Sequence, residues 1–220
     1  VEGPTGLAIV TVAEDGENTI VVIGGANDAV DAAQVTASCE ALEDAAIVVC
    51  QGEIPREGVE ALPALVRGRF LHNPAPVMEL DPAVLRASDP LVVNEHEAAL
   101  VLAQLTPDAE APEQPEQIAT ALREAGIASV VLTLGAQGSL VADADGQHRI
   151  PAATVTAVDT TGAGDAFIGA LAVGLARGES LPVAAHFASR VGAFAATGLG
   201  AQPSYPGADD ELPQLDGGSA

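Results

Sequence analysis

Beyond Asn27 the chain repeats one order of segments: a short apolar run, a break at glycine or proline, and an alanine-rich amphipathic stretch. Such alternation is typical of parallel strands in one sheet with helices on both faces. Ligands of such sheets bind at the carboxyl ends of the strands. The predicted strands are 45–50, 69–73, 90–94, 129–135, 139–144 and 153–158, and the predicted helices are 31–41, 55–68, 81–87, 95–104, 115–125, 165–177 and 182–197.

Two apolar, β-branched runs precede this pattern, at 7–13 and 19–23, and the turn sequence EDGEN joins them. They predict a β-hairpin. A chain of 220 residues with 48% hydrophobic residues is long enough for one core. We therefore expect a hairpin region over 1–27, an α/β core over 28–205 and a flexible tail over 206–220.

The chain contains no lysine, and its 31 acidic residues against 8 arginines give a formal charge of −23. Such a surface argues against nucleic acid and anionic membranes as partners. The acid excess is compatible with a high-salt cytoplasm, and the lysine-free, alanine-rich composition is equally compatible with a bias in genomic base composition. Both explanations stay open.

Neither a long apolar run nor a charged-then-apolar leader is found in the sequence. We therefore expect no membrane span and no signal peptide, and a cytoplasmic location. Cys39 and Cys50 lack the spacing of a disulfide framework or a zinc site, which favours reduced, mostly buried thiols. The four histidines share no metal-site spacing and are expected to be surface or hydrogen-bonded polar residues; they are His72, His96, His148 and His186.

The most specific motif runs from Asp159 to Phe167 and reads DTTGAGDAF. Apolar residues at helical spacing follow it, and Gly178 stands where that helix would stop. A glycine-rich turn before a helix leaves unpaired backbone N–H groups that can hold a phosphate or a developing negative charge. Asp165 in this turn has two interpretations. It is either a helix N-cap or a base that accepts the proton of a hydroxyl attacking a phosphate.

This motif resembles the C-terminal motif of the ribokinase family of sugar kinases, also called the phosphofructokinase-B family. Further segments resemble that family in the expected order: TGLAIVTVAEDGENTIVVIGGAN, VVCQGEIP, HNPAP at 72–76, LVVNEHEA, TLGAQGS and GLGAQPSYP. The resemblance implies a three-layer α/β/α sandwich with a small β lid, to which the hairpin over 1–27 belongs. It also implies that the family's N-terminal third is absent here, and that the full-length protein forms a homodimer through the lid.

The resemblance further implies transfer of the ATP γ-phosphate to the primary hydroxyl of a sugar, most simply D-ribose to ribose 5-phosphate. Asp165 would be the base, in contact with both sugar and nucleotide, and the turn Gly162, Ala163 and Gly164 would form the anion hole with it. Because lysine is absent, backbone N–H groups and metal ions would meet the nucleotide's charge. The alternatives are a kinase for fructose, a nucleoside or a related sugar, and a non-catalytic nucleotide-binding domain. A dinucleotide oxidoreductase is disfavoured, since no GxGxxG follows the first strand of a βαβ unit.

For the nucleotide and magnesium, the resemblance implies roles for Asn94 and Glu97, whose residue types alone favour a helix capping box. The loop after the predicted strand 129–135 would lie along the nucleotide, although it also reads as a simple hairpin turn. Ser189 would lie near the adenine, with plain helix surface as the alternative. The loop comprises Thr133, Leu134, Gly135, Ala136, Gln137 and Gly138.

The resemblance also implies a monovalent cation such as potassium, bound beside the anion hole by the side chains of Asp159 and Ser204. The carbonyl groups that would complete this site belong to Thr161, Ala195, Gly198 and Gly200. A glycine-rich helix terminus is the alternative explanation for the second loop. Glu53 matches a sugar-contacting position of the family, and an exposed loop glutamate is its alternative.

Overall fold

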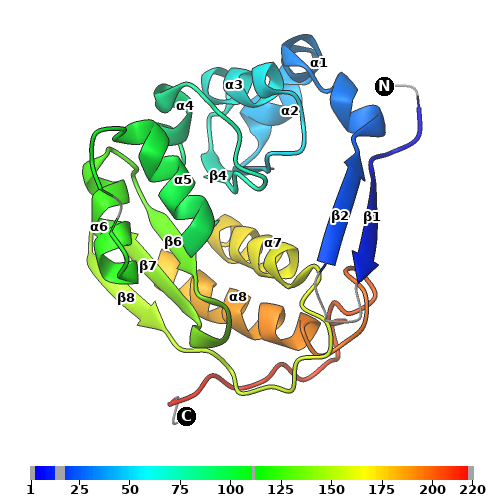
Figure 1. Cartoon of the computed structure of the whole chain (residues 1–220), viewed down its shortest axis with the longest axis vertical. Helices are drawn as coiled ribbons and strands as arrows, with labels where there is room; N and C mark the ends of the chain where they lie inside the picture. Colours follow the sequence, from blue (N-terminus) through cyan, green and yellow to red (C-terminus); the bar gives the residue numbers. More distant parts are fainter. Residues whose placement is uncertain (1–2, 13–17, 111, 218–220) are drawn as a thin grey trace.

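The computed structural model describes residues 3–12, 18–110 and 112–217, with only the backbone for 10–12 and 18–20. Strands β1 (Leu7–Val12) and β2 (Asn18–Ile23) pair antiparallel, as expected, and their connection lies outside the described residues. The main sheet has the order β3-β4-β5-β6-β7-β8, of which Figure 1 labels β4, β6, β7 and β8. Its strands are β3 (Ile47–Cys50), β4 (Arg69–His72), β5 (Leu91–Asn94), β6 (Val130–Thr133), β7 (Ser139–Asp143) and β8 (Gly146–Ile150). Strands β3 to β6 are parallel, and β7 and β8 join antiparallel.

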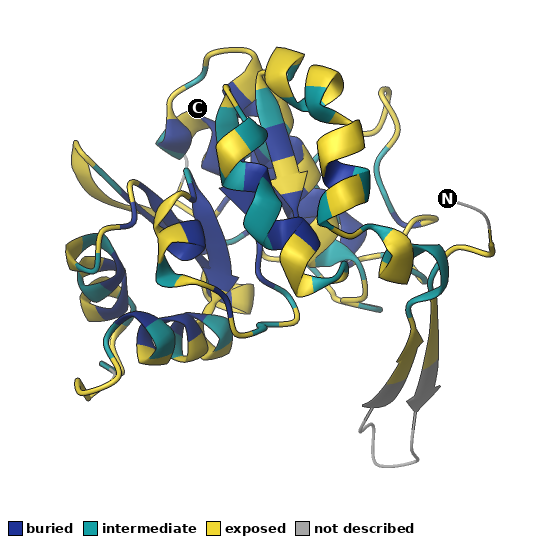
Figure 2. Ribbon diagram, turned by 90° about the horizontal axis from the view of Figure 1, so that it is seen from above, coloured by how far each residue is buried: buried dark blue, intermediate teal, exposed yellow. Residues whose placement is uncertain are grey.

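Two groups of helices cover the two faces of this sheet. One core contains Phe70, Val93 and Leu132 from the strands together with residues of the helices before β6, and the other contains Leu71 and Val92 with residues of the last two helices. Figure 2 shows these buried layers beneath exposed outer helix faces. The helices are α1 (Ala32–Ala37), α2 (Cys39–Asp44), α3 (Arg56–Leu65), α4 (Pro82–Arg86), α5 (Glu95–Leu105), α6 (Pro115–Glu124), α7 (Ala163–Ala176) and α8 (Leu181–Ala195), with short 3-10 turns η1 (Gly25–Ala29) and η2 (Gly135–Gln137). The predicted three-layer α/β/α sandwich is therefore confirmed.

The segment 153–158 was expected to be a strand, and this prediction is wrong. Its backbone is bonded outside the sheet instead: the N–H of Thr154 donates to the Asp216 carboxylate at 3.2 Å, and that of Val158 donates to the carbonyl of Ala196 at 2.8 Å. The edge strand β8 was missed, because four of its five residues are exposed and its sequence GQHRI lacks an apolar run. A mixed sheet therefore replaces the all-parallel one that alternation alone suggested.

Two further segments differ from expectation. The helix predicted over 31–41 is broken at Ser38 into α1 and α2. The C-terminal segment packs on the protein as far as Asp216, whose carboxylate accepts from the N–H of Thr154: Arg190 of α8 donates to the carbonyls of Leu212 and Pro213 at 3.0 and 2.9 Å, and Leu215 is buried. The expected frayed tail is thus held by these contacts over its described part, and residues 218–220 lie outside that part.

The β1–β2 hairpin extends away from the body of the molecule (Figure 2). Its described apolar side chains are exposed on both faces of the ribbon, with Val21 54% and Val22 64% accessible. Neighbouring residues of a strand point to opposite faces, so neither face of this end of the hairpin is covered. A two-stranded ribbon of this kind has little stability of its own.

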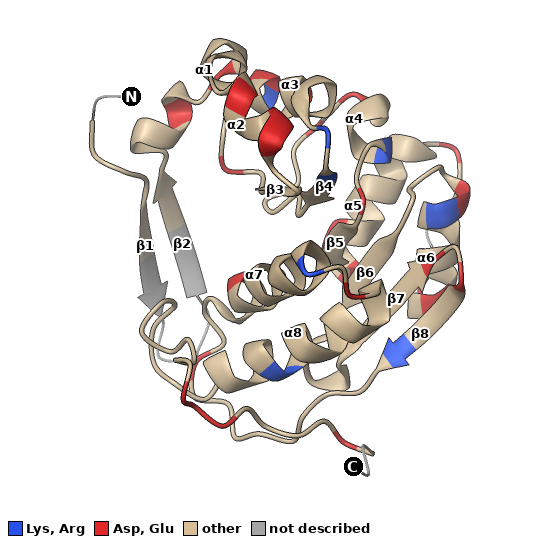
Figure 3. Cartoon of the chain, turned by 180° about the vertical axis from the view of Figure 1, so that it is seen from behind, with Lys and Arg blue, Asp and Glu red and all other residues tan. Residues whose placement is uncertain are grey.

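Acidic positions outnumber basic ones along the chain, for example on α2 and along the C-terminal segment (Figure 3). Four arginines form ion pairs with carboxylates among the described residues: Arg56, Arg67, Arg69 and Arg149. Since the formal charge of −23 already counts all 8 arginines, these pairs do not reduce the acidic excess. In the described part of the chain, no helix combines the length and the apolar character that crossing a bilayer requires.

His72 at the end of β4 departs from the expectation of a surface or fully hydrogen-bonded residue. It is completely buried and stacks on Phe70, and its Nδ1 lies 3.2 Å from the Ser88 hydroxyl, while its Nε2 has no hydrogen-bond partner among the described residues. Burial lowers the pKa of His72 from 6.5 to about 4. The ring is therefore neutral in the folded protein at neutral pH.

This buried ring makes the protein sensitive to acid. Since the pKa of His72 falls from 6.5 to about 4 on folding, the unfolded chain binds the extra proton, and stability is lost as pH falls through this window. Between about pH 7 and pH 4 the free energy of unfolding should fall by about 3 kcal/mol more in the wild type than in His72→Gln. Urea titrations measure this difference. The exposed His148→Gln variant should follow the wild type, and a His72→Gln curve parallel to the wild type would contradict the assignment.

Candidate active site

The turn before α7 has the geometry of an anion-binding helix start. Gly162 occupies the N-cap position with φ 78°, a left-handed conformation that favours glycine. A Cβ at Gly162 would lie 2.8 Å from the Cα of Ala201, so the turn packs directly against the loop that follows α8. The turn at Gly162 and the loop at Ala201, about forty residues apart in the sequence, thus lie against each other at the start of α7.

Asp165 does not cap this helix. The helix begins at Ala163, two residues before the predicted start, so Asp165 is its third residue and Gly162 holds the N-cap position. The N–H of Ala163 donates to the carbonyl of Thr160 at 3.2 Å, whereas no described residue accepts from the N–H of Gly162, Gly164 or Asp165. The N-cap interpretation is therefore wrong, and a carboxylate stands beside donors that remain available to an anion.

Asp159 joins the anion turn to the loop after α8. Its carboxylate accepts from the N–H of Thr161 at 2.9 Å and from the N–H of Gly200 at 3.0 Å. These bonds, first those from Thr161 and then that from Gly200, lower the pKa of Asp159. Ser204 is buried in the same loop, and a Cβ at Gly198 would lie 2.9 Å from the Ser204 Cβ. The Asp159 carboxylate thus bonds the same loop that carries the Ser204 hydroxyl, and both are oxygen ligands of the kind that a hard cation prefers.

Asn94 and Glu97 form the complete capping box that their residue types favour. The Asn94 side chain accepts from the N–H of Glu97 at 2.8 Å, and the Glu97 carboxylate accepts from the N–H of Asn94 at 2.8 Å. Only one Glu97 carboxylate oxygen is used in this bond; Asn94 is exposed and Glu97 is partly exposed. The cap therefore leaves oxygen atoms available for a hydrated magnesium ion.

The loop after β6 lies beside this capping box, because Asn94 and Thr133 are paired residues at the ends of β5 and β6. Leu134 is buried in the core, so its backbone alone could face a ligand. Ser189 of α8 lies close to the start of β7, with its hydroxyl oxygen 3.4 Å from that of Ser139. The structure therefore brings the predicted phosphate and adenine residues to the same end of the sheet and to α8.

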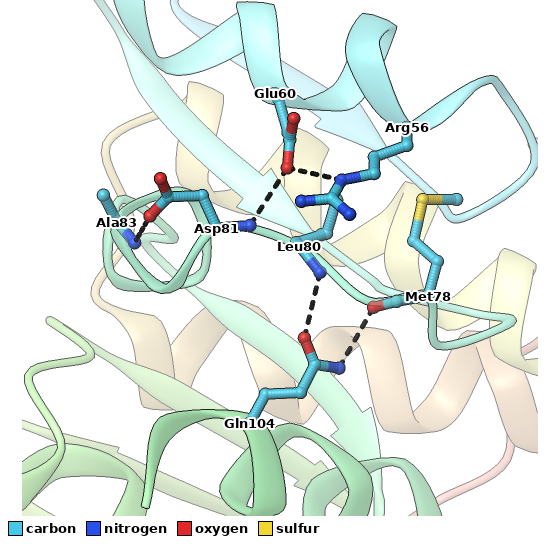
Figure 4. Close-up of polar contacts among 7 residues, drawn as sticks. All are labelled: Arg56, Glu60, Met78, Leu80, Asp81, Ala83 and Gln104. Atoms are coloured by element: carbon cyan, nitrogen blue, oxygen red, sulfur yellow. Dashed lines mark hydrogen bonds and ion pairs between the residues drawn. The ribbon is translucent and has the colours of Figure 1, made fainter.

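Glu53 lies exposed in the loop after β3, at the same end of the sheet. The neighbouring N–H of Gly52 donates to the carbonyl of Ala75 at 3.0 Å, which fixes this loop to the segment that follows β4. The Gln104 amide of α5 then holds that segment, accepting from the N–H of Leu80 and donating to the carbonyl of Met78, both at 3.0 Å (Figure 4). This network ties the Glu53 loop to the helix that carries the capping box.

A cavity of about 590 Å³ runs along α7 from Asp165. Its polar side chains are Asp165, Arg177, Tyr205 and Asp210, and its apolar walls include Phe187, Val191 and Leu212. Tyr205 and the C-terminal wall were not identified from the sequence as part of the site. Their position depends on packing between α7, α8 and the segment after residue 204, which no local pattern predicts.

The sequence model of the pfkB family carbohydrate kinases matches residues 1–208. Ribokinase from Schizosaccharomyces pombe is 37% identical over 210 residues, which cover 92% of this chain and 65% of that protein. The chain therefore spans about two thirds of the length of this relative.

Solved ribokinase structures are similar to this one, and two of them serve as examples. Ribokinase from Thermotoga maritima superposes with a TM-score of 0.85 at 31% identity, covering 94% of this chain and 68% of that one. Ribokinase from Arabidopsis thaliana complexed with ribose and ATP gives a TM-score of 0.76 at 31% identity, covering 93% of this chain and 67% of that one. The family match over residues 1–208 and the shared architecture lead to one conclusion: the chain belongs to the pfkB family of carbohydrate kinases.

Proposed function

We propose that this protein transfers the γ-phosphate of ATP to the primary hydroxyl of a sugar, and that the sugar is D-ribose. The observation that carries the proposal is Asp165, a carboxylate in the first turn of α7 that does not cap the helix and that opens onto a cavity beside free N–H groups. The relatives named ribokinase, one of them in complex with ribose and ATP, support ribose as the acceptor.

In this mechanism the Asp165 carboxylate accepts the proton of the attacking hydroxyl, which raises the nucleophilicity of that oxygen. The N–H groups of Gly162, Gly164 and Asp165 stabilise the negative charge on the transferred phosphoryl group. The N–H of Ala163 is bonded to Thr160 and contributes less. The loop 133–138 and Ser189 hold the nucleotide, and Glu53 contacts the sugar.

Two cations complete the proposed site. Asn94 and Glu97 would hold magnesium through water, and the free Glu97 oxygen suits such a contact. Asp159 and Ser204 would hold potassium with the carbonyls of Thr161, Ala195, Gly198 and Gly200, so a positive charge would lie behind the anion turn. When bound, these ions neutralise charge that the lysine-free chain cannot meet itself.

The exposed faces of the β1–β2 hairpin have a place in this function. We propose that one face covers the sugar as a lid, and that the other pairs with a second hairpin in a homodimer of the complete protein. Apolar strand faces left in water favour such association. We further propose that the enzyme works in the cytoplasm.

Incubating the purified chain with ATP, magnesium and a panel of ribose, fructose and a nucleoside tests this function. We expect ribose 5-phosphate as the main product, formed faster in potassium chloride than in tetramethylammonium chloride at the same ionic strength. Preferential transfer to fructose or the nucleoside would reassign the acceptor within the family. Bound ATP without transfer to any acceptor would contradict the kinase and favour a nucleotide-binding domain.

A further inference from the structure

The main sheet is least completely paired between β4 and β5, in the middle of its parallel strands. Strands β3 and β4 are paired along their whole length, and so are β5 and β6, whereas β4 and β5 are paired only at His72 and Leu91 in the described part of the chain. Proline explains this difference, because Pro90 before β5 and Pro74 after β4 have no N–H to donate. The ladder between these two strands is therefore cut short at both ends.

The side chain of Asn73 supplies the donor that Pro74 lacks. In a parallel pair, every second residue of a strand donates its N–H to the neighbouring strand, and the N–H of His72 donates to the carbonyl of Pro90 at 3.0 Å. The next donor in this series would be residue 74, and its acceptor would be Val92. Instead, the Nδ2 of Asn73 donates to the carbonyl of Val92 at 2.8 Å.

Asn73 also bonds the strand on its other side. The backbone N–H of Asn73 donates to the carbonyl of Cys50 at 2.9 Å, so this one residue joins β3 to β5 across the end of β4. Asn73 is only 8% exposed, and water therefore has little access to either bond. The residue closes the sheet at the carboxyl ends of the strands, where the backbone ladder between β4 and β5 has already stopped.

The two sides that Asn73 joins carry different parts of the proposed site. Glu53 follows β3, and the N–H of its neighbour Gly52 donates to the carbonyl of Ala75, in the segment that begins at Asn73, at 3.0 Å. On the other side, β5 ends at Asn94 of the capping box and is paired with β6 along its whole length. The phosphate side is thus held by the sheet itself, whereas the position of the Glu53 loop relative to it depends on the segment that Asn73 anchors.

We propose that Asn73 is a positioning residue for phosphate transfer, whose side-chain amide fixes the separation between the Glu53 loop and the capping box at the end of β5. This inference rests on the proposed function and adds a residue that acts through Glu53 rather than on a substrate. A displacement of about 1 Å between reacting groups can lower a rate about a hundredfold. Because the loop that Asn73 anchors carries Glu53, the loss of its amide should affect the acceptor and leave the nucleotide unaffected.

Asn73→Leu removes the donor and keeps a side chain of similar size. The KM for ribose should rise about tenfold, the effect of one lost hydrogen bond, and kcat should fall, while the KM for ATP stays unchanged. The matched control is Ser129→Ala, which removes the hydrogen bond from a buried hydroxyl to Asp89 before the amino ends of β5 and β6. Both variants should lower the free energy of unfolding in urea, but Ser129→Ala should keep both KM values. If Asn73→Leu does not fold, Asn73→Asp takes its place with the same expectation, since an ionised carboxylate has the same shape and no donor.

A double-mutant cycle tests whether Asn73 acts through Glu53. Glu53→Gln alone should raise the KM for ribose, and adding Asn73→Leu to it should raise that KM no further, whereas independent effects would multiply. Effects that multiply, an unchanged KM for ribose, or an equal rise in the KM for ATP would overturn the role of Asn73 and leave the kinase function intact.

Calorimetric titration of the same proteins with ribose, in the presence of ADP, separates this role from turnover. If the wild type transfers no phosphate, a ribose affinity that falls in Asn73→Leu, and falls no further in the double variant than in Glu53→Gln, would contradict the kinase function and support the positioning role. Absence of both ribose binding and transfer would overturn both proposals.

Discussion

Replacing Asp165 with asparagine should lower phosphate transfer by a factor of about 10² to 10⁴, the usual contribution of a general base. The amide keeps the size of the side chain but cannot accept the proton of the attacking hydroxyl. ATP should bind as well as before or more tightly, because the substitution removes a negative charge beside a polyanion. Initial rates with ribose and calorimetric titration with ATP measure the two effects separately.

The exposed Asp209→Asn variant is the control, since it removes the same charge from the C-terminal segment outside the first turn of α7. Its rate should equal that of the wild type. Unchanged transfer in Asp165→Asn would rule out its role as the base. Lost transfer together with lost ATP binding would point instead to damage at the anion turn.

The location of Asp165 shows what sequence could establish about the site and what it could not. The motif predicted a helix start with an anion-binding turn, and both interpretations of Asp165 were compatible with the residue types. The choice between N-cap and base depended on whether the helix begins at residue 163 or at residue 165. The structure places Gly162 at the N-cap position, so Asp165 is not the cap. Observed helix boundaries differ from predicted ones by one or two residues, because the backbone conformation at the cap, rather than the spacing of apolar residues, determines where a helix begins and ends.

The fold was predictable where burial leaves a pattern. The central strands β5 and β6 are apolar because they lie between two helical layers, so Val92 and Val93 are buried on opposite faces. The edge strand β8 lacks that signature, since four of its five residues are exposed. Segment 153–158 has the residue alternation of a strand, yet its hydrogen bonds go to Asp216 and Ala196, partners that only the tertiary structure supplies. Tyr205 enters the site by the same kind of long-range packing.

Replacing Gly162 with alanine should lower phosphate transfer about a hundredfold, because it acts on the geometry of the anion turn. The residue has φ 78°, which costs an alanine roughly 1–2 kcal/mol. In addition, the new methyl group would lie 2.8 Å from the Cα of Ala201, so the turn and the loop carrying Gly200 and Ser204 must move apart. The response to potassium should fall with the rate, since the Gly200 N–H bonds Asp159 in the same contact.

Gly178 at the other end of α7 offers the matched control. It has φ 82°, but a Cβ there would meet no atom within 4 Å. Gly178→Ala should therefore share the backbone strain and the loss of thermal stability while keeping its rate and its potassium response. The pair separates strain from contact: if both variants lose stability and neither loses transfer, the packing of the anion turn on the loop is not needed for the reaction. If only Gly162→Ala loses transfer, the position of the N–H groups, rather than overall stability, limits catalysis.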